Sequence, residues 1–465
     1  MLNYISISSF KGGRNLENKI DLTTGNISKT LLKLSLPIMG TSFIQMAYNM
    51  IDMIWVGKIG SEAVAAVGTA GFFPWLAMAF VAISRVGAEV MVAQSIGKDD
   101  TSSAKKYIKS SIEINIILST LYMITLIILN NQLVGFFNLG DSNVIKMSEE
   151  YLIIIAFSMI FYFINPILTA IFNGLGNSKI PFFINTIGLV INIILDPILI
   201  FGINGKGLGV NGAALATSLA QVVVTLSFIV VIIKNRNDYF KIRFFKDIDK
   251  KIYKEVLNLG FPVALQSGLF TIFAMIIGVV VASFGPEAIA AQKVGSQIES
   301  ISWMVCEGIG YALSSFVGQN YGAGKMDRVE KGCKSALFIS IGLGIINTLI
   351  LVIFSSKLFS LFINEPEAIK KGASYLVIIG YSQVFMCVEI IVAGIFRGLG
   401  KPLIPSIIMI VLTGLRIPMA YLLSSIIGLD GVWWSLTISS ILKGVSLYIL
   451  FFYMQKTKKI YSNAV

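Results

Sequence analysis

The 465-residue sequence is poor in charge and contains no histidine. Charged residues make up 13% of the chain, against roughly 25% in soluble globular proteins, whereas hydrophobic residues make up 55%. A surface this poor in charge would not keep a soluble protein in solution, and the high apolar content excludes a disordered chain. The composition therefore indicates a membrane protein.

The lack of histidine and the scarcity of cysteine limit the chemistry. Without histidine there is no imidazole zinc site, no Ser-His-Asp triad and no imidazole proton relay. The three cysteines, Cys306, Cys333 and Cys387, lack the spacing of a metal or redox motif. Proton or cation chemistry must therefore use carboxylates, amides, hydroxyls or the backbone. We find no nucleophile–base pair, so we expect neither an enzyme nor a cofactor.

Long apolar runs dominate the sequence instead. Runs of about 20 apolar residues can cross a bilayer as helices, and we count twelve, from Leu31–Gly57 to Val432–Tyr453. We predict an all-α integral membrane protein with twelve transmembrane helices in two six-helix lobes. The predicted parts are a cytoplasmic N-terminal segment 1–30, an N-lobe 31–233, a cytoplasmic connector 234–254, a C-lobe 255–455 and a cytoplasmic tail 456–465.

The distribution of basic residues predicts the orientation. Most of the 37 Lys and Arg residues lie on the same side of the predicted membrane as the N-terminus, and eight of them lie in Lys234–Lys254. The positive-inside rule then places both termini and the connector in the cytoplasm. The first 30 residues lack the apolar core of a cleaved signal peptide. We expect a monomeric, multi-pass protein of the plasma (inner) membrane that contacts lipid and binds no nucleic acid.

The two halves of the sequence are copies. The motif Ile-Phe-x-Gly-Leu-Gly occurs at 171–176 and again at 395–400, an offset of 224. At an offset of 225, seven residues recur in the second half: Pro37, Gly60, Glu62, Ala65, Ala66, Gln94 and Gly97. Since each half has six spans, both insert in the same sense, which predicts a pseudo-twofold axis along the membrane normal. This organisation is typical of transporters that bind substrate between their halves; a channel is the less natural alternative.

Acidic residues inside spans are costly and are therefore functional candidates. Asp52 in the first span and Asp196 in the fifth both lie roughly 8 Å below the outer rim, from about 1.5 Å of rise per residue. Asn192 shares a helix face with Asp196, Thr217 has a similar depth, and Asn49 is a secondary candidate near Asp52. These oxygens could bind Na⁺, or the two carboxylates could share a proton. Alternatively, the acids bond to helix ends or face water.

The second half carries different charges. Ile277 stands where the repeat would place the first-span acid. Glu307, Glu389 and Arg416 lie in the eighth, tenth and eleventh spans, and Lys443 lies in the twelfth. We interpret these residues as an ion-pair network that holds the helices together. The alternative is a role in cation binding or gating, and Glu307, Glu389 and Arg416 are secondary candidates for it.

The sequence resembles the multidrug and toxic compound extrusion (MATE) transporters over nearly its whole length. The resemblance rests on four groups of segments, which together are specific. They are Leu36-Pro37 with Asp52 and Val56-Gly57-x-x-Gly60; Val317-Gly318-Gln319-Asn320-x-Gly322-Ala323-Gly324; Gly174-Leu175-Gly176-Asn177 with Asp196-Pro197; and Gly209-Val210-Asn211-Gly212-Ala213-Ala214.

The resemblance implies two six-helix lobes around a V-shaped cleft and export of organic cations driven by Na⁺ or H⁺. In many members the ion site uses a first-helix Asp, an Asn-x-x-x-Asp in the fifth helix and a nearby Thr. These match Asp52, Asn192, Asp196 and Thr217, of which the first three would be metal ligands if the ion is Na⁺. Other members rely on carboxylates in the seventh and tenth helices, whereas here the seventh span has none and Glu389 stands alone in the tenth.

We therefore predict a secondary active antiporter that exports amphipathic organic cations, such as drugs and dyes, in exchange for Na⁺ or H⁺. The alternative is a flippase for a lipid-linked or polysaccharide precursor, because the looser superfamily includes such proteins. Those flippases typically carry a more basic central cavity than the four basic residues within the spans of this chain provide.

Overall fold

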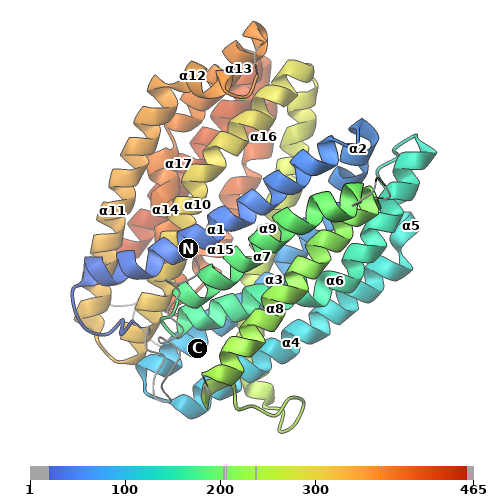
Figure 1. Ribbon diagram of the computed structural model, residues 1–465. Coiled ribbons are helices and arrows are strands. Elements are labelled where there is room, and N and C mark those ends of the chain that lie inside the picture. The colour runs from blue at the N-terminus through green and yellow to red at the C-terminus, as the bar shows by residue number, and fades with distance from the viewer. Residues whose placement is uncertain (1–19, 203–204, 206, 236–237, 364, 458–465) are drawn as a thin grey trace, which may run out of the picture. The chain divides into compact units, whose positions relative to one another are not determined.

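The computed structural model describes residues 20–202, 205, 207–235, 238–363 and 365–457, and within these ranges the chain is helical and contains no strand (Figure 1). Most of the predicted N-terminal segment 1–30 and of the predicted tail 456–465 lies outside the described residues. The all-helical prediction is confirmed.

The described helices account for the predicted membrane spans. Nine are long and apolar enough to cross a membrane, and a tenth span results when α13 (Pro366–Gly380) and α14 (Gln383–Gly398), which meet at a 51° bend, are taken together. Two further long helices, α1 (Ile27–Gly57) and α10 (Pro286–Gly322), are too polar to qualify by composition. With these two the layout agrees with twelve spans. The two polar helices are also those that carry several of the candidate acids.

The chain forms two compact units. Unit 1 contains residues up to Gly25 and Gly40–Leu257, and unit 2 contains Asn26–Met39 and the chain from Asn258 onward. These limits follow from contacts and differ from those predicted for the lobes. The first half of α1 groups with unit 2, whereas the connector and the first two turns of α9 (Lys250–Ala282) group with unit 1.

Unit 1 is built around α6, which packs against α2, α3, α4 and α8. Besides the second half of α1, its helices are α2 (Ser61–Ala70), α3 (Phe72–Gly97), α4 (Thr101–Ile128), α5 (Asn130–Gly135), α6 (Ser142–Gly174), α7 (Lys179–Phe201), α8 (Val210–Lys234) and the 3₁₀ helix η3 (Asp238–Phe240).

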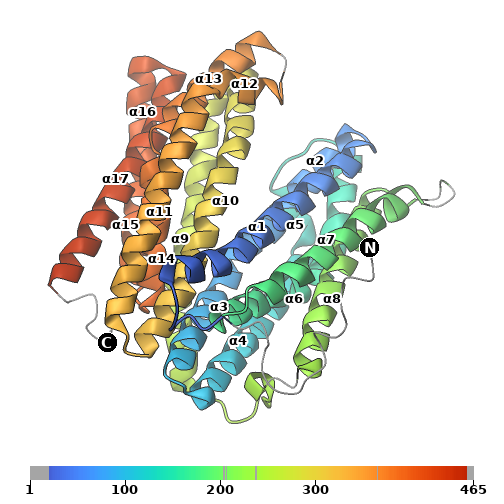
Figure 2. The same cartoon turned by 60° about the vertical axis from the view of Figure 1, so that its left-hand side comes forward.

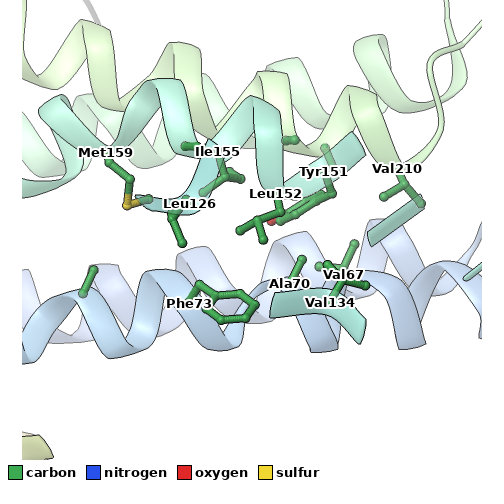
Figure 3. Packing of buried hydrophobic residues seen from close by; sticks show 14 of the residues in the cluster. Val67, Ala70, Phe73, Leu126, Val134, Tyr151, Leu152, Ile155, Met159 and Val210 are labelled. Carbon is green, nitrogen blue, oxygen red and sulfur yellow. The ribbon is translucent and has the colours of Figure 1, made fainter. Parts of the chain in front are cut away.

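The apolar core of unit 1 lies where α6 faces the helices before it in sequence. Figure 3 shows Tyr151, Leu152 and Ile155 of α6 opposite Phe73 and Val67, and all five side chains are buried. In a bilayer the lipid tails are as apolar as these side chains, so the association is stabilised by close packing rather than by removal from water. This packing fixes the position of α6, and α8 in turn packs against α6.

Unit 2 repeats the plan around α14, which packs against α10, α11 and α17 (Figure 2). Its helices are the first half of α1 and the rest of α9, together with α10, α11 (Met326–Ile353), α12 (Ser355–Ser360), α13, α14, α15 (Leu403–Gly414), α16 (Arg416–Ile427) and α17 (Leu429–Lys456).

The same turn ends the central helix of both units. Helix α6 ends at Gly174 and α14 ends at Gly398, and two residues later Gly176 and Gly400 have φ values of +83° and +77°. Residues with a Cβ rarely adopt this left-handed conformation, whereas glycine does so at little cost. The turn requires glycine at this position in each half, which explains why the Gly-Leu-Gly motif recurs.

The described part of the connector packs on unit 1. Glu113 of α4 is fully buried and accepts hydrogen bonds from the Tyr253 hydroxyl and the Phe245 backbone N–H. In the next turn of α9, Val256 lies so close to α3 that a Cβ on Gly87 would come within 2.8 Å of its Cγ1 atom. The start of α9 is therefore held by both polar and apolar contacts within unit 1.

Candidate functional site

Unit 1 brings the four main candidate residues together. Asp52 lies near the end of α1, Asn192 and Asp196 lie on α7, and Thr217 lies on α8. The Thr217 hydroxyl donates to Asp52 Oδ2 at 3.0 Å, and Asn192 Nδ2 donates to Asp196 Oδ1 at 3.1 Å. The carboxyl groups of Asp52 and Asp196 lie within hydrogen-bonding reach of each other. Three helices thus converge on one polar cluster, which we call the aspartate cluster.

The sequence of α7 explains how the cluster is positioned. Asn192 and Asp196 are one helical turn apart, so both side chains point to the same face, and both are 0% exposed. One turn before Asn192, a Cβ on Gly188 would lie 2.4 Å from Val224 Cγ2, so the glycine lets α7 approach α8 closely. Pro197 follows the acid and cannot donate a backbone hydrogen bond within the helix.

Four buried polar atoms of the cluster have no hydrogen-bond partner among the described residues. They are Asp52 Oδ1, Asp196 Oδ2, Asn192 Oδ1 and the Tyr48 hydroxyl oxygen. Neither carboxyl group forms an ion pair with a Lys or Arg in the part of the chain that the structure describes. Buried polar atoms normally have partners, so this arrangement is incomplete without a proton, a cation or water.

The atoms present fit either a proton or a hard monovalent cation. Carboxylate, amide and hydroxyl oxygens are the ligands that hard cations prefer. Within the described ranges no group of three or more His, Cys, Asp or Glu side chains gathers, so the amide and hydroxyl oxygens would have to complete a coordination shell. Two adjacent carboxyl groups can alternatively share one proton.

The sequence did not single out Tyr48 and gave more weight to Asn49. Tyr48 lies one full turn before Asp52, on the same face of α1, and its side chain is buried. Asn49 is exposed, and its side chain forms no hydrogen bond within the described residues. The i,i+4 spacing from Asp52 was the signal that would have identified Tyr48.

The secondary candidates lie in unit 2, where two of them have basic or hydroxyl partners. Glu389 of α14 accepts a hydrogen bond from Lys443 Nζ of α17 at 2.8 Å, and both side chains are about 6% exposed. Arg416 of α16 donates to the Ser439 hydroxyl at 3.1 Å and to the Ser440 hydroxyl at 3.0 Å. The Glu389–Lys443 contact is of the kind that an ion-pair network predicts, whereas the contacts of Arg416 with Ser439 and Ser440 are hydrogen bonds to neutral groups.

Helix α10 carries two more acids. Glu299, which the sequence reasoning did not single out, accepts a hydrogen bond from the Tyr375 hydroxyl at 3.2 Å. It also interacts electrostatically with Arg416. Glu307 lies two turns further along α10 and accepts a hydrogen bond from Tyr311 at 2.9 Å. The mixture of acids and bases in unit 2 contrasts with the aspartate cluster of unit 1.

A comparison with protein families identifies the chain. The family model described as MatE matches residues 37–198 and, a second time, residues 262–422. The chain belongs to the MatE family. The two matched segments begin 225 positions apart and end 224 positions apart, so the internal repeat found in the sequence is confirmed.

Individual relatives cover nearly the whole chain. The probable multidrug resistance protein NorM of Thermotoga maritima is 28% identical over 436 residues, which are 93% of this chain and 94% of NorM. The FAD transporter of Shewanella oneidensis is 28% identical over 457 residues, 94% of this chain and 96% of the relative. A solved multidrug resistance MATE transporter in an outward-facing conformation has a TM-score of 0.87 at 24% identity and covers 97% of this chain and 100% of its own, which shows the fold.

This MatE chain therefore has multidrug efflux transporters among its relatives and the multi-pass helical fold of a membrane transporter. Family members transport solutes rather than catalyse reactions.

Proposed function

We propose that this MatE chain is a secondary active antiporter that exports amphipathic organic cations in exchange for Na⁺ or H⁺. The coupling ion binds at the aspartate cluster, with Asp52, Asn192 and Asp196 as its ligands if the ion is Na⁺ and Thr217 holding Asp52 in place. The observation that carries this proposal is a pair of carboxyl groups that each have a buried, unpartnered oxygen and no basic partner among the described residues.

The cluster is suited to coupling because its free energy depends strongly on the ion. Two carboxylates in contact repel each other, and a proton or a cation between them removes the repulsion. An ion shifts a conformational equilibrium by the difference in its affinity for the two states. A rearrangement of α1 against α7 and α8 would change the distance between Asp52 and Asp196 and so the affinity for the ion.

The rest of the proposal follows from the sequence. The basic residues place both termini and the connector in the cytoplasm, so export runs outward across the plasma (inner) membrane. The 31 Phe, 17 Met and 16 Tyr residues supply adaptable apolar and aromatic surfaces, which suit cations of varied shape. We expect a monomer in lipid without a nucleic-acid partner, a cofactor or an enzymatic activity.

The test is ethidium movement in vesicles that contain the purified protein, with a Na⁺ gradient and a pH gradient imposed separately. Ethidium export driven by the Na⁺ gradient alone would identify a sodium site, and export driven by the pH gradient alone would identify a proton exchanger. If well-folded protein responds to neither gradient, the antiporter proposal is wrong.

A second candidate cargo is a flavin dinucleotide, because the Shewanella oneidensis relative that is named an FAD transporter aligns over 94% of this chain. Such a cargo is anionic, so it would not share the charge preference of ethidium. FAD offered in the same vesicles separates the two cargoes. The matched relatives favour multidrug export over the flippase alternative.

A further inference from the structure

The buried acid of unit 2 is paired with a base on the neighbouring helix. Glu389 lies on α14 and Lys443 on α17, two helices that pack together. Their 2.8 Å contact, which is made through Glu389 Oε1, is almost wholly removed from solvent, whereas Glu389 Oε2 is buried without a hydrogen-bond partner among the described residues. A carboxylate and an ammonium group can each be buried at this depth only because the other neutralises it.

The surrounding charges are also balanced. Lys443 interacts electrostatically with Glu299 and Arg416 as well as with Glu389, and Arg416 in turn interacts with both acids and with Tyr375. Two acids therefore face two bases, and a tyrosine hydroxyl donates to one of the acids. The helices that contribute these groups are α10, α13, α14, α16 and α17.

The aspartate cluster of unit 1 has the opposite balance. It also contains two acids, the buried Asp196 and the half-buried Asp52, but no Lys or Arg pairs with them among the described residues. A free cation or a proton can complete this cluster and leave again. At Glu389 the positive charge next to the carboxylate is the ammonium group of Lys443, which is part of the protein and cannot dissociate.

We propose that Lys443 is a tethered cation that keeps Glu389 from binding an exchangeable ion, so that ion exchange is confined to unit 1. Because the ammonium group is attached to the same unit, it does not lose the translational freedom that a free ion loses on binding. Lys443 thereby determines which unit is ion-coupled. The inference rests on the proposed function for the part played by unit 1, whereas the blocking of Glu389 is independent of it.

The test uses N,N′-dicyclohexylcarbodiimide, an apolar carbodiimide that adds to protonated carboxyl groups. Purified protein in detergent is treated with the reagent, and the modified residues are located by peptide mass spectrometry. In the native protein we expect no adduct at Glu389. In Lys443→Met we expect the yield of the Glu389 adduct to rise about tenfold or more, because the loss of a buried ion-pair partner exceeds the equivalent of one decade.

Two further variants keep the test decisive. Lys443→Arg retains a cation and is expected to leave Glu389 unmodified, and Lys443→Gln replaces Lys443→Met if the methionine variant does not elute as a single folded species. An unmodified Glu389 in a folded, uncharged variant would overturn the proposal, because Arg416 alone would then be neutralising the acid. An adduct at Glu389 in the native protein would overturn it as well.

The same experiment separates this inference from the proposed function. Adducts at Asp52 or Asp196 that are suppressed by Na⁺ or by raised pH report on ion binding in unit 1. If no adduct forms at Asp52 or Asp196 while the Glu389 adduct increases on substitution of Lys443, the proposed coupling site is wrong and the inference about Lys443 is supported.

Discussion

Each unit has a central helix that ends in the same kind of turn, but the aspartate cluster of unit 1 and Glu389 of unit 2 have opposite kinds of partner. In unit 1, Asp52 and Asp196 lie together with amide and hydroxyl groups only. In unit 2, Glu389 is joined to Lys443 at 2.8 Å. The comparison teaches that the fold does not fix the chemistry of a repeat. After duplication the same scaffold holds two acids without a basic partner in one copy and an acid paired with a lysine in the other.

The largest effect is expected from a substitution of Asp52. We expect Asp52→Asn to reduce gradient-driven ethidium export to the level of protein-free vesicles, because one of the two carboxyl groups that bind the ion is lost. The measurement is the initial rate in vesicles with equal amounts of folded protein.

A matched control is Asp238→Asn, the same chemical change at an exposed acid outside the helical spans. Lys241 lies 2.6 Å from Asp238 and lowers the pKa of that carboxyl group, so Asp238 is ionised as Asp52 can be, but it lies outside the cluster. Glu389→Gln should impair export less than Asp52→Asn. Equal losses in both would show that unit 2 is also ion-coupled.

Removing the buried carboxylate of Glu389 in unit 2 should lower the stability of the protein, but removing that of Asp196 in unit 1 should not. Glu389→Gln leaves the Lys443 ammonium group buried without its partner, so we expect it to lower the free energy of unfolding by about 3–5 kcal/mol. Asp196→Asn removes one of two adjacent like charges and should leave the melting temperature unchanged or raise it. Thermal unfolding in detergent without Na⁺ measures both. A loss of stability in Asp196→Asn as large as that in Glu389→Gln would remove the distinction between the units.

Unit 1 also contains a buried acid, Glu113, that accepts hydrogen bonds from within the unit, and we expect it to serve stability rather than ion binding. Glu113→Ala removes the acceptor of the Tyr253 hydroxyl and the Phe245 N–H, both of which are only partly buried, and each lost hydrogen bond costs about 0.5–1.5 kcal/mol. We expect the connector to become more sensitive to trypsin. Lys146→Ala, which loses only an exposed 4.0 Å contact with Glu150, should leave the cleavage rate unchanged. A connector as resistant in Glu113→Ala as in the native protein would show that apolar packing alone holds it.

The smallest effect is expected at Tyr48. Tyr48→Phe removes one hydroxyl oxygen from the aspartate cluster and leaves the ring in its apolar contacts. We expect about a fivefold weaker half-saturation by the coupling ion, with little change in maximal rate, since one hydrogen-bonding partner contributes about 1 kcal/mol. The dependence of ethidium export on ion concentration measures it. An unchanged half-saturation would exclude Tyr48 from the ion site.

Much of the repeat and of the aspartate cluster could be predicted because each depends on single residues or on simple spacings in the sequence. The repeat follows from equal offsets, and the meeting of Asp52 with Asp196 follows from equal depths in spans of the same direction. Asn192 follows from its i,i+4 spacing to Asp196. Each of these depends on the period and direction of a helix, which apolar runs reveal directly.

The rest depends on helix rotation and packing between distant segments. Nothing in the sequence states which face of α1 points to α7, so the sequence favours Asn49, whereas in the structure Tyr48 is buried and Asn49 is exposed. The partner of Glu389 is 54 residues away on α17, and its identity required the contact itself. The hydrogen bonds that hold the connector on α4 likewise join residues more than 130 positions apart.

The central claim is that ion exchange at the aspartate cluster drives export, and simultaneous recording of both fluxes tests it most directly. In vesicles loaded so that ethidium and the ion can move only in opposite directions, the account predicts matched ethidium efflux and Na⁺ or H⁺ influx in the native protein and neither flux in Asp52→Asn. Ethidium efflux without ion influx, or matched fluxes that persist in Asp52→Asn, would contradict it.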